Sequence, residues 1–221
     1  MDARTDGHDT EHSNIDALMM ERCIRLSAKA TKNGELPFAS LICKGNELLV
    51  ETTNLVVRDG DVTRHAEIVA ISEAQKALGR RDLAECTLYS TVEPCAMCSY
   101  AIRETRIARV IYSIKSPMMG GLSKWNVLRD PELSQVMPEI FGPVPEVVAG
   151  LMRREAEHVW SKWNPLYWGA IRIGGYLGGD PQAGCEHLPA LPERRSLLRR
   201  FFARHSRAAS KFATKSRGPS Y

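Results

Sequence analysis

Residues 87–98 read TLYSTVEPCAMC, and residues 63–67 further upstream read TRHAE. The first stretch passes from a β-branched and aromatic run, typical of a strand, through Pro94 into a Cys-x-x-Cys pair. The second places His65 and Glu67 at the start of an apolar pattern with helical spacing. Each stretch therefore predicts a helix that begins at chemically reactive side chains, and the rest of the fold prediction is built around these two helix starts.

The elements around the two stretches alternate between helix and strand. The expected helices cover residues 13–33, 66–78, 95–105 and 151–163, and the expected strands cover residues 38–43, 48–54, 87–92, 108–113 and 146–150. Ser13 and Asp16 have the spacing of a capping box at the start of the first helix. The order of the elements predicts an α/β protein whose sheet is covered by helices on both faces, with parallel strand pairs at the crossovers.

The cysteine pair and the histidine form a candidate metal site. Cys95 and Cys98 are three residues apart, so a helix places them on one face, and its N-terminus stabilises their thiolates. With His65 they provide the ligand set of a catalytic zinc whose fourth position is left to water. Glu67 lies where its carboxylate can reach that water without binding the metal. The alternative is a structural zinc site that is closed by a fourth ligand such as Cys86.

The two motifs in this order resemble the signature of zinc deaminases. Over roughly residues 15–164 the chain is similar to the cytidine and deoxycytidylate deaminase superfamily, and within it to the guanine, cytosine and tRNA-adenosine deaminase branch. The resemblance implies a three-layer α/β/α sandwich with a mixed central sheet of about five strands. It also implies one Zn²⁺ per chain, held by His65, Cys95 and Cys98, and a homodimer.

The same resemblance implies how the reaction proceeds. Zinc activates a water, and Glu67 is the catalytic residue that moves protons from this water to the ring nitrogen and to the departing ammonia. Asn54 and the backbone N–H of Ala66 orient the polar edge of the base, and Phe38 provides a stacking wall. The chain departs from the family pattern at Ala39-Ser40, where the family usually has Gly-Ala.

Three further residues are weaker candidates for the site. Glu93 directly precedes the Pro-Cys motif, and its interpretations as a buried structural carboxylate and as a chemical participant have equal support. Trp163 belongs to a C-terminal segment of the kind that often closes the pocket in this family, and Trp125 is a candidate for the pocket rim. Packing in the domain core is the simpler interpretation of the C-terminal tryptophan.

Composition indicates a globular cytoplasmic protein. Of 221 residues, 43% are apolar and 25% are charged, which excludes wholesale disorder. The first twenty residues lack the apolar region of a secretory signal, and no stretch approaches the roughly 18 apolar residues of a membrane helix. Six unevenly spaced cysteines in a chain of this size predict reduced thiols rather than disulfides.

We expect four segments along the chain. They are a disordered polar N-terminus (1–12), the deaminase domain (13–170), a Gly/Pro-rich linker (171–192) and a basic, amphipathic tail (193–221). Residues 174–221 hold nine basic and three acidic side chains, against 21 and 23 in the remainder, so the formal net charge of +4 arises in the tail. Such a tail can bind nucleic acid or an anionic membrane surface, although a solubilising extension is the favoured interpretation.

These features predict a hydrolase that acts on the carbon–nitrogen bonds of cyclic amidines. The nearly neutral body favours a free nucleobase or small nucleoside as substrate, with guanine or a related aminopurine first and cytosine second, in purine metabolism. Adenosine-to-inosine deamination in tRNA is the alternative, which requires phosphate contacts from clustered Lys and Arg. A zinc-stabilised binding module without turnover is a second alternative, and it leaves Glu67 without a role.

Overall fold

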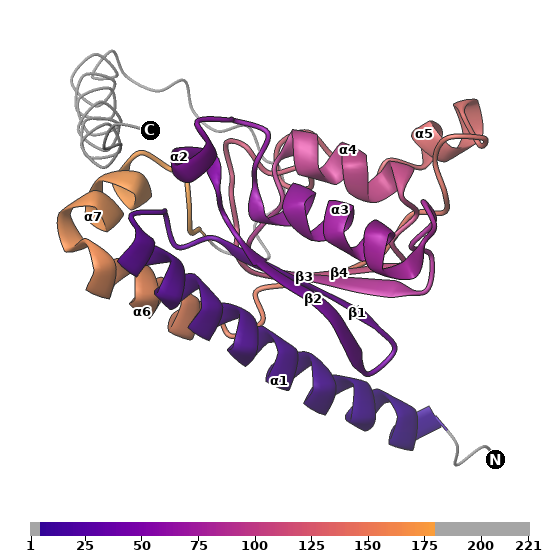
Figure 1. The fold of residues 1–221 in the computed structure, drawn as a ribbon, viewed down its shortest axis with the longest axis horizontal. Helices are drawn as coiled ribbons and strands as arrows, with labels where there is room; N and C mark the ends of the chain where they lie inside the picture. The colour runs from indigo at the N-terminus through magenta and orange to yellow at the C-terminus, as the bar shows by residue number, and fades with distance from the viewer. Residues whose placement is uncertain (1–4, 180–221) are drawn as a thin grey trace, which may run out of the picture.

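The computed structural model describes the fold of residues 5–179 and the side chains of residues 14–179. A five-stranded sheet forms its middle layer (Figure 1), in the order β2-β1-β3-β4-β5. The strands are β1 (Ala39–Lys44), β2 (Glu47–Thr53), β3 (Cys86–Val92), β4 (Arg109–Ile114) and β5 (Glu146–Ala149). β1 pairs antiparallel with β2 and β3, whereas β3, β4 and β5 run parallel. The predicted mixed sheet is confirmed.

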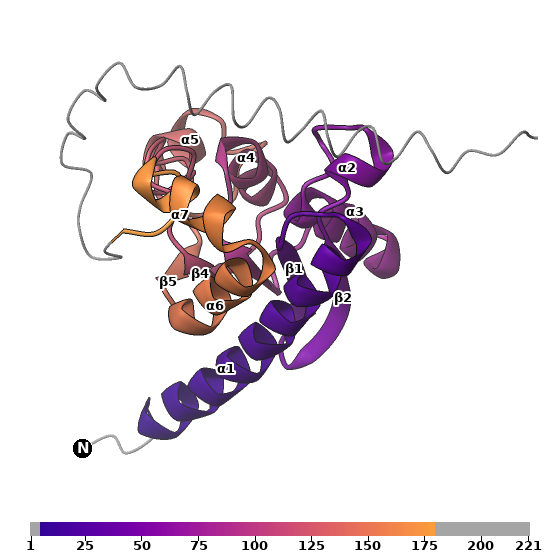
Figure 2. The ribbon, with the colours of Figure 1, turned by 90° about the vertical axis from the view of Figure 1, so that its left-hand side faces the viewer.

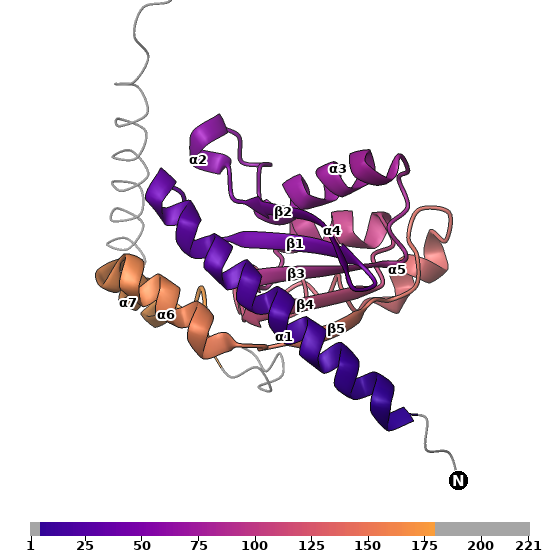
Figure 3. The same cartoon turned by 60° about the horizontal axis from the view of Figure 1, so that its bottom comes forward.

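Helices cover both faces of this sheet (Figures 1 and 3). α1 (Thr5–Ala30) and α6 (Arg153–Trp163) lie on one face, and α3 (Ala66–Leu78) and α4 (Ala96–Glu104) lie on the other. α7 (Pro165–Ile173) follows α6 directly, while α2 (Val56–Asp59), α5 (Pro131–Val136) and the 3₁₀ turn η1 (Thr31–Asn33) belong to connections. The predicted α/β/α sandwich is therefore confirmed. Within residues 5–179, no helix is long and apolar enough to cross a bilayer.

Each face of the sheet has its own apolar core. Leu41 of β1 packs beneath α1 and α6 with Tyr89 and Trp160. The next residue along the strand, Ile42, packs beneath α3 and α4 with Leu88. Successive side chains of a strand point to opposite faces, so a sheet that is covered on both sides needs apolar residues in a continuous run. The run in β1 therefore fixes this strand between two helical layers.

The N-terminal helix is longer than its sequence indicated. α1 begins at Thr5, so the helix includes most of the segment at residues 1–12 for which we expected disorder. The capping box at Ser13 is wrong, because Asp16 lies inside the helix and accepts hydrogen bonds from the Tyr89 hydroxyl at 2.7 Å and from Arg109 at 3.0 Å. Once packing fixes the central turns of a helix, each further turn forms at little cost.

Regular structure also continues past the domain boundary expected at residue 171. α7 extends to Ile173, and Leu177 is buried in the same core as Trp168. The start signals of α7 were present in the sequence, since the Asn164 side chain accepts a hydrogen bond from the Tyr167 N–H and a proline follows it. Glycines with positive φ in residues 175–179 form turns and not a linker. Residues 180–192 of the predicted linker and the tail at 193–221 lie outside the described residues.

Candidate active site

Two helix N-termini meet beside the end of β3, as the sequence predicted. His65 is the N-cap residue of α3 and Cys95 is that of α4, both with extended backbone. Their carbonyl groups accept the first helical hydrogen bonds, from Val69 at 3.0 Å and from Ser99 at 2.8 Å. Cys98 follows one turn into α4 and is fully buried. The helix starts therefore bring one imidazole and two sulfurs together.

The distances among these three side chains fit a tetrahedral zinc ion. The Nδ1 atom of His65 lies 3.5 Å from the Sγ atoms of both Cys95 and Cys98, and the two Sγ atoms are 3.6 Å apart. Zinc with tetrahedral bonds of ordinary length separates two sulfurs by about 3.8 Å and sulfur from nitrogen by about 3.6 Å. Within the described part of the chain, only these three residues form such a group, so Cys86 does not close it.

The two cysteines share a proton, which prepares them for a cation. Hydrogen bonding from Cys98 lowers the pKa of Cys95 to about 4, with a further contribution from His65. The reciprocal hydrogen bond and burial raise the pKa of Cys98 well above its usual value. One thiolate is therefore present at neutral pH. Because zinc binds cysteine as thiolate, its binding also releases the second proton.

Glu67 lies beside this group without belonging to it. Its side chain is buried. It accepts a hydrogen bond from Ser90 Oγ at 3.2 Å and a longer one from Cys98 Sγ at 3.6 Å. Burial raises the pKa of Glu67 above its ordinary value. A carboxyl group next to a metal site can both accept and donate a proton during a reaction. Ser90 was not predicted from the sequence.

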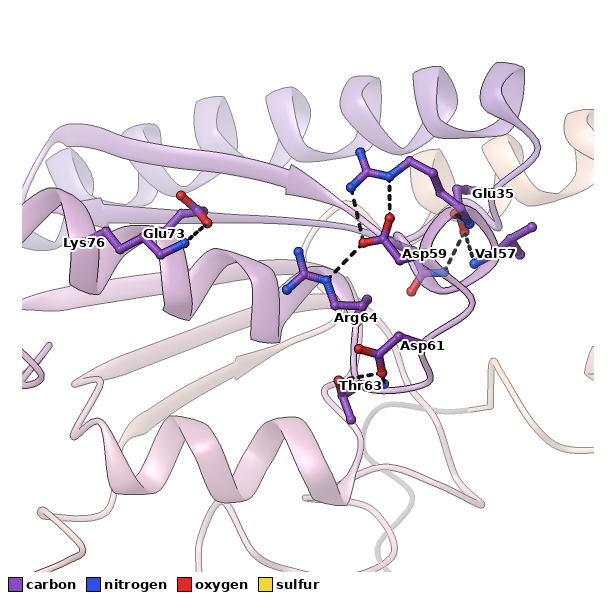
Figure 4. A network of polar contacts seen from close by, with 10 residues as sticks. Glu35, Val57, Asp59, Asp61, Thr63, Arg64, Glu73 and Lys76 are labelled. Atoms are coloured by element: carbon purple, nitrogen blue, oxygen red, sulfur yellow. Dashed lines mark hydrogen bonds and ion pairs between the residues drawn. The ribbon is translucent and has the colours of Figure 1, made fainter. Parts of the chain in front are cut away.

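Backbone hydrogen bonds place Asn54 next to His65. The Asn54 N–H donates to the carbonyl of Phe38 at 3.1 Å, and the following Leu55 N–H donates to the carbonyl of Arg64 at 3.0 Å. The intervening loop is held by an ion pair of 3.2 Å between Arg64 and Asp59 (Figure 4). The segment after β2 and the start of α3 are thus fixed side by side.

Two connected cavities lie above the site. The inner one, of about 70 Å³, is lined by Asn54 and Glu67 together with His65 and Cys95 of the metal group. The outer one, of about 460 Å³, is walled mainly by apolar and aromatic residues: Leu36, Trp160, Tyr167, Ile171 and Tyr176. The two share Phe38, His65, Met119 and Leu177. Neither cavity, as far as the described residues line it, is walled by a lysine or an arginine.

The remaining predicted site residues are placed as follows. Phe38 lines both cavities, and its ring meets Trp160 edge to face at 5.2 Å. Ala66 is the first residue of α3, so its N–H is one of the groups that a helix leaves without an internal partner. Trp125 is 58% exposed and lines neither cavity. Trp163 also lines neither of them and packs on Trp160, which reaches the outer cavity instead.

Glu93 organises a loop through its buried carboxylate. It accepts hydrogen bonds from the backbone N–H groups of Ser116, Leu122 and Ser123 at 2.8, 3.0 and 2.6 Å, and from the Ser123 hydroxyl at 2.5 Å. The loop passes so close that a Cβ at Gly120 would overlap the carboxylate. These bonds fit the structural interpretation of Glu93, which also lines the inner cavity.

Several cavity residues were missed at the sequence level. Met119 lies in the connection that follows β4, for which no function was predicted, and Tyr176 and Leu177 belong to the segment interpreted as a linker. No local pattern marks them, because their role arises from contacts with residues far away in the chain.

A mixed α/β/α sandwich with a His/Cys/Cys group at two helix N-termini and a carboxylate beside it defines a zinc-dependent hydrolase of the deaminase class. A family model, described as the cytidine and deoxycytidylate deaminase zinc-binding region, matches residues 13–114. The chain belongs to the cytidine and deoxycytidylate deaminase superfamily. It is accordingly an enzyme that hydrolyses carbon–nitrogen bonds in nucleobases or nucleosides, with zinc as its cofactor.

Individual relatives carry more than one substrate name. The tRNA-specific adenosine deaminase of Aquifex aeolicus is 38% identical over 124 residues, which cover 56% of this chain and 82% of that protein. The probable cytosine deaminase of Schizosaccharomyces pombe is 37% identical over 132 residues, 60% and 75% of the two chains. A structure from a study of A-to-I editing by tRNA:A34 deaminases has 28% identity and a TM-score of 0.57, and covers 64% of this chain and 99% of that chain.

Proposed function

We propose that this chain hydrolytically removes the exocyclic amine of a small, uncharged base. Guanine or a related aminopurine is the first candidate, and cytosine is the second. The observation that carries the proposal is the outer cavity, whose wall of aromatic and aliphatic side chains suits a planar, uncharged molecule. The C-terminal segment around α7 contributes Tyr167, Ile171, Tyr176 and Leu177 to this wall.

Charge supports a small substrate over a nucleic acid. Phosphate groups are bound by Lys and Arg side chains, and a protein that holds tRNA uses several of them. Residues 14–179 carry 20 basic and 19 acidic side chains, a nearly neutral balance. Arg58 and Arg64, close to the site in sequence, both form ion pairs with Asp59. The surroundings of the cavity thus offer little attraction to a phosphate backbone.

The chain's own residues then have the following roles. Zinc, when bound by His65, Cys95 and Cys98, would supply an activated water. The Glu67 carboxylate would accept one proton of this water and pass it to the ring nitrogen while the oxygen bonds to the carbon that bears the amine. Glu67 would then accept the second proton of that oxygen and pass it to the amine, so that the carbon–nitrogen bond breaks, a carbonyl forms and ammonia leaves.

Residues at the wall of the inner cavity would orient the substrate. Asn54 lies at this wall and can hydrogen-bond a polar ring edge, and the Ala66 N–H can donate a second hydrogen bond. The Phe38 ring, which lines both cavities, can stack against the base. Trp125 and Trp163 have no part in this arrangement.

Adenosine in tRNA is the second candidate substrate. Similarity to named relatives supports it better than it supports a free base, because proteins called tRNA-specific adenosine deaminase recur among them. For a flipped adenosine, the aromatic outer cavity would hold the neighbouring nucleotides by stacking. The two candidates therefore differ in one requirement: tRNA needs phosphate contacts from the protein, and a free base does not.

An ammonia-release assay separates the two candidates. The zinc-loaded chain is assayed with guanine, adenine, cytosine, their nucleosides and tRNA, at low and at high salt. The proposal expects turnover of a free base or nucleoside that changes little with salt. Turnover of tRNA alone, with a steep fall as salt rises, would overturn it in favour of tRNA editing.

Three broader expectations accompany the proposal. The homodimer stays a prediction, which light scattering of the purified chain checks. A cytoplasmic location also stays a prediction, and the five free thiols among the described residues are compatible with a reducing compartment. The possible nucleic-acid contact through residues 193–221 is checked by comparing tRNA affinity of the full chain with that of a chain ending at residue 179.

A further inference from the structure

Glu35 is a buried carboxylate that the reaction above does not use. It is 3% exposed and lies between η1 and β1. Its oxygens accept hydrogen bonds from Asn54 Nδ2 at 2.9 Å, from the Arg58 backbone N–H at 2.8 Å and from the Val57 backbone N–H at 3.4 Å (Figure 4). Across residues 14–179, no cationic side chain forms an ion pair with it.

This contact determines how the Asn54 side chain is oriented. A carboxylate only accepts hydrogen bonds, so the amide must turn its NH₂ group toward Glu35. The reverse orientation would bring two acceptor oxygens together and leave the amide oxygen without a donor. Asn54 Oδ1, which has no hydrogen-bond partner within the described residues, is then the acceptor that remains for the inner cavity, whose wall Asn54 forms.

We infer that Glu35 is a positioning residue that fixes the amide of Asn54 and thereby makes Oδ1 the group that reads the base. The inference rests on the proposed function, and it narrows the substrate class. A carbonyl oxygen at the cavity wall selects a ring edge that carries an N–H donor. Guanine has such a group, as do the free bases adenine and cytosine. The ring of adenosine has only acceptor nitrogens.

The hydrogen bonds of Glu35 suit a residue that positions the Asn54 amide. Two backbone N–H groups from the segment of α2 hold the carboxylate, so it cannot turn away when a substrate enters. The Asn54 backbone is itself fixed by its bond to Phe38. Groups that are held before the substrate binds discriminate better than groups that adapt, because no reorganisation compensates a mismatch.

The test measures binding in a background that does not consume the substrate. In zinc-loaded Glu67→Gln protein, dissociation constants are measured by calorimetry for guanine, adenine, cytosine and adenosine. Glu35→Gln is then added, since the amide NH₂ of glutamine can donate to Oδ1 and so reverse the orientation of Asn54. We expect the preferred ring N–H base to bind about tenfold more weakly and the preference to move toward adenosine. Glu47→Gln, an exposed glutamate on β2, is the matched control.

A double-mutant cycle shows whether Glu35 acts through Asn54. In the Asn54→Ala background, Glu35→Gln should have no further effect on the affinity of the preferred base. A loss of the same size with and without Asn54, or a uniform weakening for all four ligands, would overturn the inference and leave Glu35 as a purely structural residue.

NMR reads the orientation without any substrate. The side-chain NH₂ signals of Asn54 are assigned with an Asn54→Asp variant of the full zinc-loaded chain. One of the two protons should be shifted downfield by the carboxylate, and this shift should vanish in Glu35→Gln and persist in Glu47→Gln. Its absence from the parent protein contradicts the inference. If none of the four ligands binds, the proposed substrate class fails, while the NMR result still decides the orientation.

Discussion

The Oε2 atom of Glu67 lies 3.6 Å from the Sγ atom of Cys98, so the buried carboxylate touches the metal group while remaining outside it. The proposed function assigns metal binding and proton transfer to different residues, so substitutions should separate the two effects. Both side chains are buried.

Glu67→Gln should retain zinc and lose nearly all turnover. Glutamine keeps the size of the side chain but cannot carry the proton, and general acid–base catalysis contributes typically about 10²–10⁴-fold to a rate. Zinc content by atomic absorption and ammonia release with the best substrate are measured on the same preparation. Near-normal turnover by the zinc-loaded variant would remove Glu67 from the proton transfer.

His65→Ala should lose the metal itself. Two thiolates remain, but a three-ligand site that loses its imidazole binds zinc much more weakly. The expected result is a variant that is purified with little zinc and inactivated further by mild chelators. His158→Ala on α6 is the control, because this histidine belongs to no metal group in the described structure. Full zinc occupancy in His65→Ala would count against the ligand assignment.

Gly120→Ala should disturb the loop that Glu93 organises. The added methyl group would overlap the Glu93 carboxylate, so either the loop or its hydrogen bonds must shift. We expect a loss of about 1–3 kcal/mol in the free energy of unfolding and a raised KM, since the same loop carries Met119 of the cavity wall.

A second glycine provides the control for this substitution. Gly169 lies in α7 with open space where a Cβ would stand, so Gly169→Ala should be neutral or stabilise by up to about 1 kcal/mol. Urea unfolding and steady-state kinetics measure both variants. If the two glycines respond alike, the tight contact between Gly120 and Glu93 does not exist in solution.

The stability of the zinc-free protein should depend on pH through Glu67. Burial raises the pKa of Glu67 in the folded chain, so the folded state binds more protons than the unfolded state once the pH exceeds the ordinary value near 4.5. Stability contributed by the protonated group is thus present below that value and is lost as the pH rises through the folded pKa. Glu67→Gln should remove this loss.

Chelator-treated protein tests this dependence. Urea unfolding of the parent and of Glu67→Gln is followed from pH 4 to pH 8. The variant should gain stability relative to the parent as the pH rises, with the difference levelling off above the folded pKa. Parallel stability curves for the two proteins would mean that Glu67 is not buried in an ionised form at neutral pH.

Asp16→Ala should destabilise the fold without touching the site. Asp16 joins α1 to the sheet through Tyr89 and Arg109, and its loss leaves a buried hydroxyl without its partner. We expect a loss of about 1–3 kcal/mol in the free energy of unfolding. Glu21→Ala, which removes an exposed ion pair on the same helix, should cost less than about 1 kcal/mol. Equal losses in the two variants would contradict a special role for Asp16.

The sequence alone predicted the metal group, the helix starts that hold it and the mixed sheet. These features are local: a capping residue, a Cys-x-x-Cys spacing and an unbroken apolar run each depend on a few neighbouring residues. The predicted helix at residues 66–78 matches α3 in both of its bounds. The exact ends of α1 were missed and α7 was not predicted, because packing and not propensity decides how far a helix extends.

Only the tertiary structure decided what surrounds the metal group. Met119 and Leu177, which are 58 residues apart in the sequence, both line the inner cavity, and Glu35 meets Asn54 across nineteen residues. Such contacts follow from the way two helical layers close over a twisted sheet, and no local pattern encodes them. Two short motifs therefore predicted the zinc chemistry of this enzyme. The side chains that line its proposed substrate cavity meet only in the folded chain.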